Sequence, residues 1–211
     1  MLGHRGARAS RQVPENTFAS FELCLEHGCD GFEFDVRQSS DGVAVVCHDP
    51  VSAGLPIART PAHVLDLPTL DSILGQFSSR AFLDIELKVC GLESQVVEAL
   101  RAQVPQEEYV VSSFLVEALR TVHQLDPAIP LGFLFDRHHQ ACPEDISITW
   151  LIPHFKLVSP GLVEQVHAQG KKIMVWTVND AGQMRMFAEW GVDSIISDDP
   201  QLLVRSVGEA H

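Results

Sequence analysis

Two apolar segments of the sequence carry acidic residues at every second position. In the segment 30–36, Glu33 and Asp35 fall on one face of an extended strand, because successive side chains of a strand alternate between its two faces. The segment 82–88 repeats the pattern, and its shared polar face is formed by Asp84, Glu86 and Lys88. Both segments are therefore predicted to be strands with one polar face and one apolar face.

Carboxylates gathered at strand ends are costly to bury unless a positive charge neutralises them. Carboxylate oxygens suit hard cations such as Mg²⁺ or Ca²⁺ better than softer metals. We take Glu33, Asp35 and Glu86 as the candidate ligands of one divalent cation. The alternative is that these acids pair with Arg or Lys at a rim, or face solvent.

Two histidines, His4 and His48, lie where strands are expected to end. His48 follows the apolar run 43–47 and precedes Asp49-Pro50, a turn signal. The ordinary pKa of histidine lets one imidazole donate a proton near neutral pH while another accepts one. A pair of this kind beside a metal ion suits displacement at phosphorus, whereas a surface position is the plainer interpretation of each histidine alone.

Three further residues have two interpretations each. Arg5 and Lys88 could neutralise the non-bridging oxygens of a phosphate, or form salt bridges with the neighbouring acids. Trp176 either packs in the core with its strand neighbours or, at the mouth of a barrel, forms a wall of the pocket.

The elements that position these residues alternate between strand and helix. The predicted strands are 30–37, 43–47, 81–88, 109–113, 131–135, 155–158, 172–178 and 194–197. The predicted helices are 17–27, 69–76, 92–103, 116–125, 161–168, 181–190 and 201–207. Such alternation predicts a parallel sheet that is covered by helices.

An open doubly wound sheet and a closed eightfold barrel both fit this alternation. Gly3-His4-Arg5-Gly6 lacks the GxGxxG pattern of the open dinucleotide-binding form. A barrel needs about eight strands and about 200 residues or more, and this chain of 211 residues is near that lower limit. We expect one domain over residues 1–211, in which the Pro- and Gly-containing segment 50–68 is a loop excursion.

Composition excludes several classes of function. Lys and Arg number 15 against 28 Asp and Glu, which gives a formal charge of −13 and disfavours nucleic acid and anionic membranes as partners. The apolar runs are too short to span a bilayer, so no stable membrane insertion is expected. No secretion signal is recognisable, which favours the cytoplasm. The five cysteines have no CxxC spacing and indicate neither a disulfide framework nor a zinc site.

Seven motifs in order resemble those of the glycerophosphodiester phosphodiesterase family, and they extend from residue 3 to about residue 203. The motifs are His4-Arg5-Gly6, Pro14-Glu15-Asn16-Thr17, Glu33-Phe34-Asp35-Val36, Asp41-Gly42 with Val45-Val46-Cys47-His48-Asp49, Glu86-Leu87-Lys88, Trp176-Thr177-Val178-Asn179, and Gly191-Val192-Asp193 with Ser197-Asp198-Asp199-Pro200. Any one motif is weak, but their order and spacing are specific.

The resemblance implies a compact TIM-type (β/α)8 barrel that hydrolyses glycerophosphodiesters, such as glycerophosphocholine, to glycerol 3-phosphate and an alcohol. It implies one divalent cation, Mg²⁺, Ca²⁺ or Mn²⁺, held by the three candidate ligands. By the same resemblance His4 and His48 are the general acid and base, Arg5 and Lys88 bind phosphate, Glu15 and Asn16 support the site, and Trp176 lines the pocket.

The sequence departs from the family pattern in three places. The insertion that usually follows the second histidine is reduced to residues 49–67, which favours a more open pocket. The first strand is expected to be short, and Ser stands at Ser40 and Ser197 where the family often has Thr.

Two other functions fit the same residues: a lysophospholipase D-like hydrolase of lipid headgroups, and a barrel that binds phosphodiesters without hydrolysing them. The sequence leaves open the headgroup, the ion, the oligomeric state and the assignment of acid and base to the two histidines. It also leaves open whether water attacks directly or a glycerol hydroxyl attacks through a cyclic phosphate.

Overall fold

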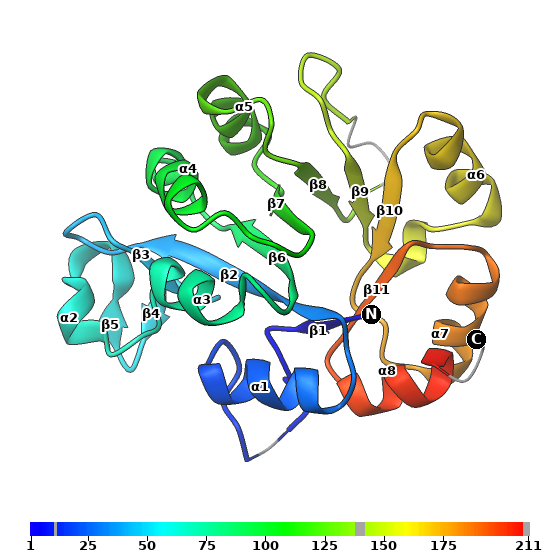
Figure 1. The fold of residues 1–211 in the computed structure, drawn as a ribbon, viewed down its shortest axis with the longest axis horizontal. Helices are drawn as coiled ribbons and strands as arrows, with labels where there is room; N and C mark the ends of the chain where they lie inside the picture. The colour runs from blue at the N-terminus through cyan, green and yellow to red at the C-terminus, as the bar shows by residue number, and fades with distance from the viewer. Residues whose placement is uncertain (11, 138–141, 209–211) are drawn as a thin grey trace.

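The computed structural model describes residues 1–10, 12–137 and 142–208. In this part of the chain, eight parallel strands close into a barrel because β1 pairs with both β2 and β11 (Figure 1). The barrel strands are β1 (Leu2–His4), β2 (Gly31–Gln38), β6 (Phe82–Leu87), β7 (Tyr109–Ser113), β8 (Leu131–Phe135), β9 (Trp150–Pro153), β10 (Lys172–Val175) and β11 (Ser194–Ser197). This closure confirms the TIM-type fold over the open sheet.

Helices surround the barrel on its outer side (Figure 1). They are α1 (Phe18–Glu26), α3 (Leu70–Phe77), α4 (Glu93–Ala102), α5 (Val116–Leu125), α6 (Pro160–Ala168), α7 (Ala181–Glu189) and α8 (Pro200–Val207). Residues 50–68, the predicted loop excursion, contain the hairpin β4 (Val51–Ser52) and β5 (Leu55–Pro56), the 3₁₀ helix Ile57–Arg59 and the short helix α2 (Ala62–Leu65). These pieces lie beside β2 and β3 in Figure 1.

Local sequence signals set the ends of the helices. The side chain of Thr17 accepts a hydrogen bond from Ser20 N at the start of α1, and Thr69 and Ser72 form a capping box at α3. Helix α8 begins with Pro200, whose missing N–H is no loss in the first turn. These residues mark the first turns of α1, α3 and α8.

One predicted strand was wrong. Residues 155–158 do not form a strand, because Phe155–Leu157 is a 3₁₀ helix that begins after His154, whose Nδ1 accepts from Lys156 N. The barrel strand in this region is β9, four residues long and apolar on both faces, so it lacks the alternation on which the prediction relied.

Two other predicted strands depart from the structure in role or length, and one of them, 172–178, ends at Val175 as β10. The predicted strand 43–47 is the short β3 (Ala44–Val46), which pairs antiparallel with the end of β2 outside the barrel. The first strand, β1, has three residues, as expected from the sequence. Its pairing with two neighbours compensates for its short length.

The core has an outer and an inner part. Outside the barrel, Phe32 and Phe34 of β2 are fully buried against Phe21 of α1 and Phe77 of α3, and the rings of Phe21 and Phe32 stack at 4.1 Å. Inside the barrel, a second apolar cluster is formed by side chains of β1 and of β7 to β11. Its buried members are Leu2, Val110, Leu134, Trp150, Ile152, Met174 and Ile196. The alternation of β2 predicted this division, since its aromatic residues face outward and its acids face inward.

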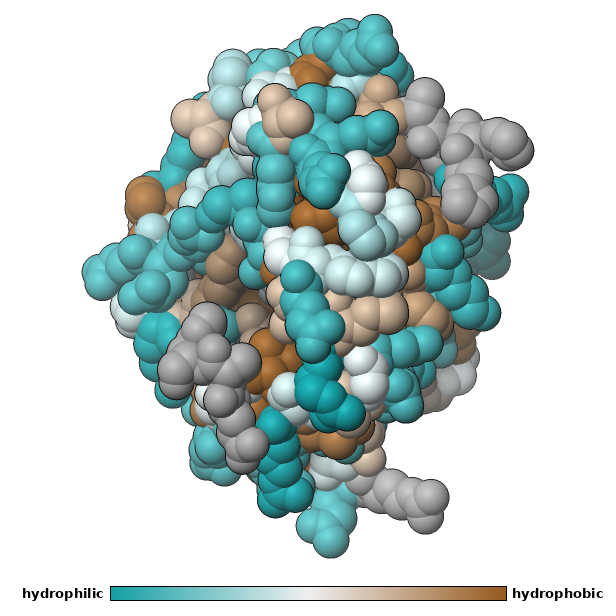
Figure 2. Space-filling model, turned by 90° about the vertical axis from the view of Figure 1, so that its right-hand side faces the viewer, coloured by the Kyte–Doolittle hydropathy of each residue, from teal (hydrophilic) through white to brown (hydrophobic). Residues whose placement is uncertain are grey.

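Figure 2 shows hydrophilic side chains over most of one face of the molecule, with smaller hydrophobic areas between them. Among the described residues, no helix has the length and apolar character needed to cross a membrane.

Candidate active site

A cavity of about 250 Å³ opens at the carboxyl-terminal ends of the barrel strands. The residues that line it are His4, Arg5, Glu33, His48, Asp84, Glu86, Lys88, Phe114, Leu134, Trp176 and Ile196. Seven of the ten residues predicted from the sequence are in this set, and Asp35, Glu15 and Asn16 contact members of it. The structure thus brings all ten together, although they come from separate parts of the chain.

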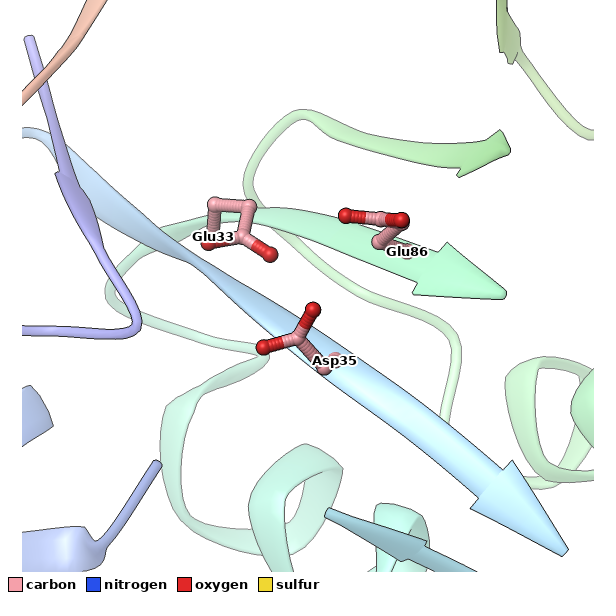
Figure 3. A group of neighbouring side chains, drawn as sticks. All are labelled: Glu33, Asp35 and Glu86. Carbon is pink, nitrogen blue, oxygen red and sulfur yellow. The ribbon is translucent and has the colours of Figure 1, made fainter. Parts of the chain in front are cut away.

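The three candidate metal ligands converge between two neighbouring strands. Asp35 of β2 lies directly opposite Glu86 of β6, and Glu33 lies two residues deeper on β2. One oxygen from each carboxylate lies within 4.8 Å of the other two, and all three residues are buried. Figure 3 shows the three carboxylates from β2 and β6 directed toward a common point. This group could hold a metal ion.

Two unpaired oxygens support that interpretation. Glu33 Oε1 and Asp35 Oδ1 are buried and have no hydrogen-bond partner. Buried polar atoms are nearly always hydrogen-bonded in proteins, and the only cation near either oxygen among the described residues is Lys88, whose Nζ lies 3.4 Å from Asp35 Oδ1, so both oxygens can take a further partner. Because the donors are all carboxylate oxygens, they fit a hard divalent cation.

The electrostatics of the cluster show the cost of leaving it without a cation. Burial, together with the charges of Asp35 and Glu86, raises the pKa of Glu33 well above its usual value. Burial also raises the pKa of Glu86 to about 7, although the charge of Lys88 opposes this. These carboxyls therefore retain protons that they would lose in water, and a bound cation would favour their ionised form.

The basic residues Arg5 and Lys88 pair with the acids of the cluster. Lys88 Nζ donates to Glu86 Oε1 at 2.7 Å and lies 3.4 Å from Asp35 Oδ1. Arg5 Nε lies 3.2 Å from Asp35 Oδ2 as an ion pair without hydrogen-bond geometry. The salt-bridge interpretation of both residues is thus correct for this structure, and both also line the cavity.

Glu15 and Asn16 hold the first loop in place. Glu15 Oε1 accepts from Arg5 at 2.7 Å, and Asn16 Nδ2 donates to Asp35 Oδ2 at 2.8 Å. Arg5 and Asn16 both have left-handed backbone, with φ of 53° and 58°, a conformation that is costly for residues other than glycine and is concentrated at functional sites. The neighbouring Gly6 has no such cost, and a Cβ at this position would lie 2.1 Å from Ser20 Oγ.

His4 is fixed by a carboxylate that our sequence reasoning did not select. Its Nδ1 lies 2.6 Å from Asp198 Oδ1, and its Nε2 lies 3.8 Å from Glu33 Oε2. Burial would raise the pKa of Asp198, but the hydrogen bond and charge of His4 hold it below its usual value. An ionised carboxylate only accepts hydrogen bonds, so Nδ1 carries a proton and donates it to Asp198, while Nε2 is directed toward the cavity.

The environment of Asp198 explains its ionisation. Asn179 Nδ2 donates to Asp198 Oδ2 at 2.6 Å, and Arg8 donates to Oδ1 at 3.1 Å. Burial lowers the pKa of His4, and the neighbouring Asp198 offsets part of this effect. A signal for Asp198 was present in the sequence, because it directly follows the last predicted strand.

His48 has a different environment at the rim. Its side chain is 34% exposed, and its Nδ1 lies 2.7 Å from Asp49 Oδ1, which is itself mostly exposed. Arg37 Nε donates to the carbonyl oxygen of His48 at 2.7 Å and fixes the backbone. The two histidines thus reach the cavity from β1 and from the loop after β3, one buried and one near solvent.

An apolar wall faces the acids. Trp176 directly follows β10, and its ring meets Phe114, which directly follows β7, edge to face at 5.4 Å. The indole N–H of Trp176 donates to Ile152 O at 2.9 Å, which fixes the ring. Leu134 and Ile196 continue this wall toward the barrel interior. The predicted position of Trp176 at the pocket is confirmed, while Phe114 was missed because one aromatic residue after a strand is a weak signal.

A closed (β/α)8 barrel with a polar cavity at the carboxyl-terminal ends of its strands has the architecture of a TIM-barrel enzyme, in which the active site is formed at that end. The model of the glycerophosphoryl diester phosphodiesterase family matches residues 4–94 and 88–202. The chain belongs to this family, and it is a phosphodiesterase.

Relatives of known name agree over nearly the whole chain. A glycerophosphodiester phosphodiesterase of Caldanaerobacter subterraneus is 30% identical, and the alignment covers 98% of this chain and 97% of the relative. The crystal structure of an Oleispira antarctica phosphodiesterase in complex with the product sn-glycerol-3-phosphate is 29% identical and covers 98% of this chain and 96% of that one, with a TM-score of 0.85. The glycerophosphodiester phosphodiesterase of Thermotoga maritima is 26% identical, with a TM-score of 0.83 over 97% of this chain and 96% of that one.

Proposed function

We propose that this protein hydrolyses glycerophosphodiesters, such as glycerophosphocholine and glycerophosphoethanolamine, to glycerol 3-phosphate and an alcohol. The observation that supports this most is the convergence of Glu33, Asp35 and Glu86 beside two histidines in one cavity of a family member. The Oleispira relative, with sn-glycerol-3-phosphate as its bound product, supports the choice of substrate class. In this proposal residues 1–211 act as one domain.

In this mechanism the three carboxylates hold one divalent cation, Mg²⁺, Ca²⁺ or Mn²⁺. The cation supplies charge neutralisation at the phosphate and lowers the pKa of the attacking oxygen when it is bound. Arg5 and Lys88 line the same cavity and neutralise the non-bridging oxygens of the phosphate. The positive charges of the cation, Arg5 and Lys88 lie next to the substrate, so they determine the binding of an anionic phosphate more than the net charge of −13 of the whole chain does.

The two histidines move the protons. One imidazole takes the proton of the attacking oxygen, and the other gives a proton to the departing alkoxide, with each role worth about 10² to 10⁴ in rate. Asp198 holds Nδ1 of His4 and so directs Nε2 at the substrate. His48, near the rim, can reach a different side of the phosphorus. The attacking oxygen comes from water or from the glycerol hydroxyl, in the latter case through a cyclic phosphate.

The test is an assay of purified protein on glycerophosphocholine that measures released glycerol 3-phosphate. A chelator is expected to abolish release, and Mg²⁺, Ca²⁺ or Mn²⁺ to restore it. His4→Ala and Glu86→Ala are expected to lose nearly all activity, whereas Glu98→Ala, an exposed site on α4, is the matched control. Full activity in either site variant contradicts the assigned roles.

A parallel assay on lysophospholipids separates the remaining alternatives. Turnover of lysophospholipids alone would establish a lysophospholipase D-like enzyme instead. Binding of glycerophosphodiesters without release of glycerol 3-phosphate under any of the three cations would establish a non-catalytic barrel.

A further inference from the structure

A fourth acid, Asp84, lines the same cavity but lies outside the group of candidate ligands. It lies on β6, fully buried, opposite Glu33 of β2 and two residues before Glu86. Two residues of strand span roughly 6.6 Å, so Asp84 is one inward-facing position deeper in the barrel than Glu86. Its place is the floor of the cavity.

Asp84 has one satisfied oxygen and one unsatisfied oxygen. Ser112 Oγ donates to Asp84 Oδ1 at 2.5 Å, and this bond fixes the carboxyl group from the side of β7. Asp84 Oδ2 is buried and has no hydrogen-bond partner. A buried acceptor of this kind costs free energy unless a donor reaches it.

Within residues 1–10, 12–137 and 142–208, no side chain or backbone group donates to Asp84 Oδ2. The nearby cavity walls are Leu134 of β8 and Ile196 of β11, both buried and apolar. The basic side chains of the site pair with other acids nearer the mouth, where Lys88 forms an ion pair with Glu86. A molecule that enters the cavity can therefore supply the donor for Oδ2.

We propose that Asp84 Oδ2 accepts a hydrogen bond from a hydroxyl of the glycerol unit of the substrate. The inference rests on the proposed function, which places the phosphate at Arg5 and Lys88 near the mouth. A short polyol attached to that phosphate extends inward along the apolar wall and presents a hydroxyl to the floor. Asp84 is then a specificity residue, which distinguishes glycerol from an alcohol of equal length without hydroxyls.

The experiment compares two ligands that need no turnover. The dissociation constants of glycerol 3-phosphate and propyl phosphate are measured by calorimetry on the folded protein with Mg²⁺ present. One hydrogen bond corresponds to about 10-fold in affinity. We expect Asp84→Leu to weaken the binding of glycerol 3-phosphate by about 10-fold or more. The binding of propyl phosphate is expected to weaken by less than about 3-fold.

Ser112→Ala is the matched control, because it removes the partner of Oδ1 and leaves Oδ2 in place. We expect it to change neither constant by more than about 3-fold. If it reproduces the selective loss of Asp84→Leu, Asp84 acts only through its structural bond and the proposal is overturned. Equal weakening of both ligands by Asp84→Leu, or no weakening, also overturns it.

Asp84→Ala removes both carboxylate oxygens without adding bulk and serves if Asp84→Leu does not fold. It too is expected to narrow the preference for glycerol 3-phosphate, and an unchanged preference overturns the proposal. Hydrolysis of glycerophosphocholine by the unaltered protein is measured alongside. Absent hydrolysis with selective binding of glycerol 3-phosphate contradicts the proposed function, whereas hydrolysis without selectivity contradicts only the role of Asp84.

Discussion

On one side of the cavity, β1, β2 and β6 supply His4 and four buried carboxylates. On the other side, β8 and β11 supply Leu134 and Ile196, and Trp176 directly follows β10. The apolar side follows the ordinary pattern of barrel interiors, which are filled with branched side chains. The acidic side breaks that pattern and is less stable for it, since its carboxyls are buried without enough positive charge. The apolar side contributes indirectly, because the low dielectric it maintains strengthens every charge interaction across the cavity.

Removing one ligand from the acidic side should have the largest effect. Glu86→Gln keeps the size of the side chain but deletes one of three anionic oxygens that converge at the proposed cation site. We expect kcat/KM on glycerophosphocholine to fall by about 10³-fold. Glu98→Gln on the outer face of α4 should change it by less than about 2-fold. A Glu86→Gln enzyme with near-normal kcat/KM would show that the acids of this side are structural.

The stability of the acidic side should depend on pH and on the cation. Burial raises the pKa of Asp84 and of Glu86 to about 7, from ordinary values of 3.8 and 4.5. Their folded-state pKa values lie above the unfolded ones, so the unfolded state binds fewer protons between these limits and stability falls as the pH rises through this window.

We expect the cation-free protein to lose about 5 kcal/mol of unfolding free energy between about pH 5 and about pH 8, roughly half from each carboxyl group. Urea unfolding at the two pH values measures this change. Saturating Mg²⁺ should restore about 3 kcal/mol, mainly at the higher pH, because it binds the ionised carboxylates. Equal stabilisation by Mg²⁺ at both pH values would contradict a link between these carboxyls and the cation.

The orientation of His4 gives a smaller predicted effect. Asp198→Asn removes the charge that holds Nδ1 protonated, but it keeps a side chain of the same shape. We expect kcat to fall by about 10- to 100-fold with KM nearly unchanged. Asp199→Asn is the neighbouring control, because Asp199 caps α8 and does not contact His4. An equal loss in both variants would assign the effect to the loop.

The apolar side should tolerate change best. Trp176→Phe keeps an aromatic wall but loses the hydrogen bond from the indole to Ile152 O. The loss of one neutral hydrogen bond corresponds to about 1 kcal/mol, and we expect kcat/KM to fall by about 5-fold. A loss near that of Glu86→Gln would mean that the wall takes part in the chemistry and would remove the contrast between the two sides.

The sequence predicted the acidic side of the barrel better than the rest, for a physical reason. On β2 and β6 the period of two is visible, because polar and apolar faces differ, and it placed Glu33, Asp35 and Glu86 together. On β9 both faces are buried, the alternation disappears, and the strand was assigned to residues 155–158 instead of Trp150–Pro153.

Contacts that depend on barrel closure were also beyond the sequence pattern. Asp84 was on the predicted polar face, but its deeper level and its bond with Ser112 follow from the register between β6 and β7. The pairing of Asp198 with His4 needs β11 next to β1. Local patterns therefore show which face a residue occupies but not which distant partner it meets.

The separation of His4 and Asp198 by 194 positions has a consequence for biosynthesis. A ribosome-bound or clipped chain that lacks the residues from β11 onward already contains Glu33, Asp35 and Glu86, yet it has no Asp198 to orient the imidazole of His4. The orientation of His4 is therefore completed only when β11 pairs with β1 and closes the ring.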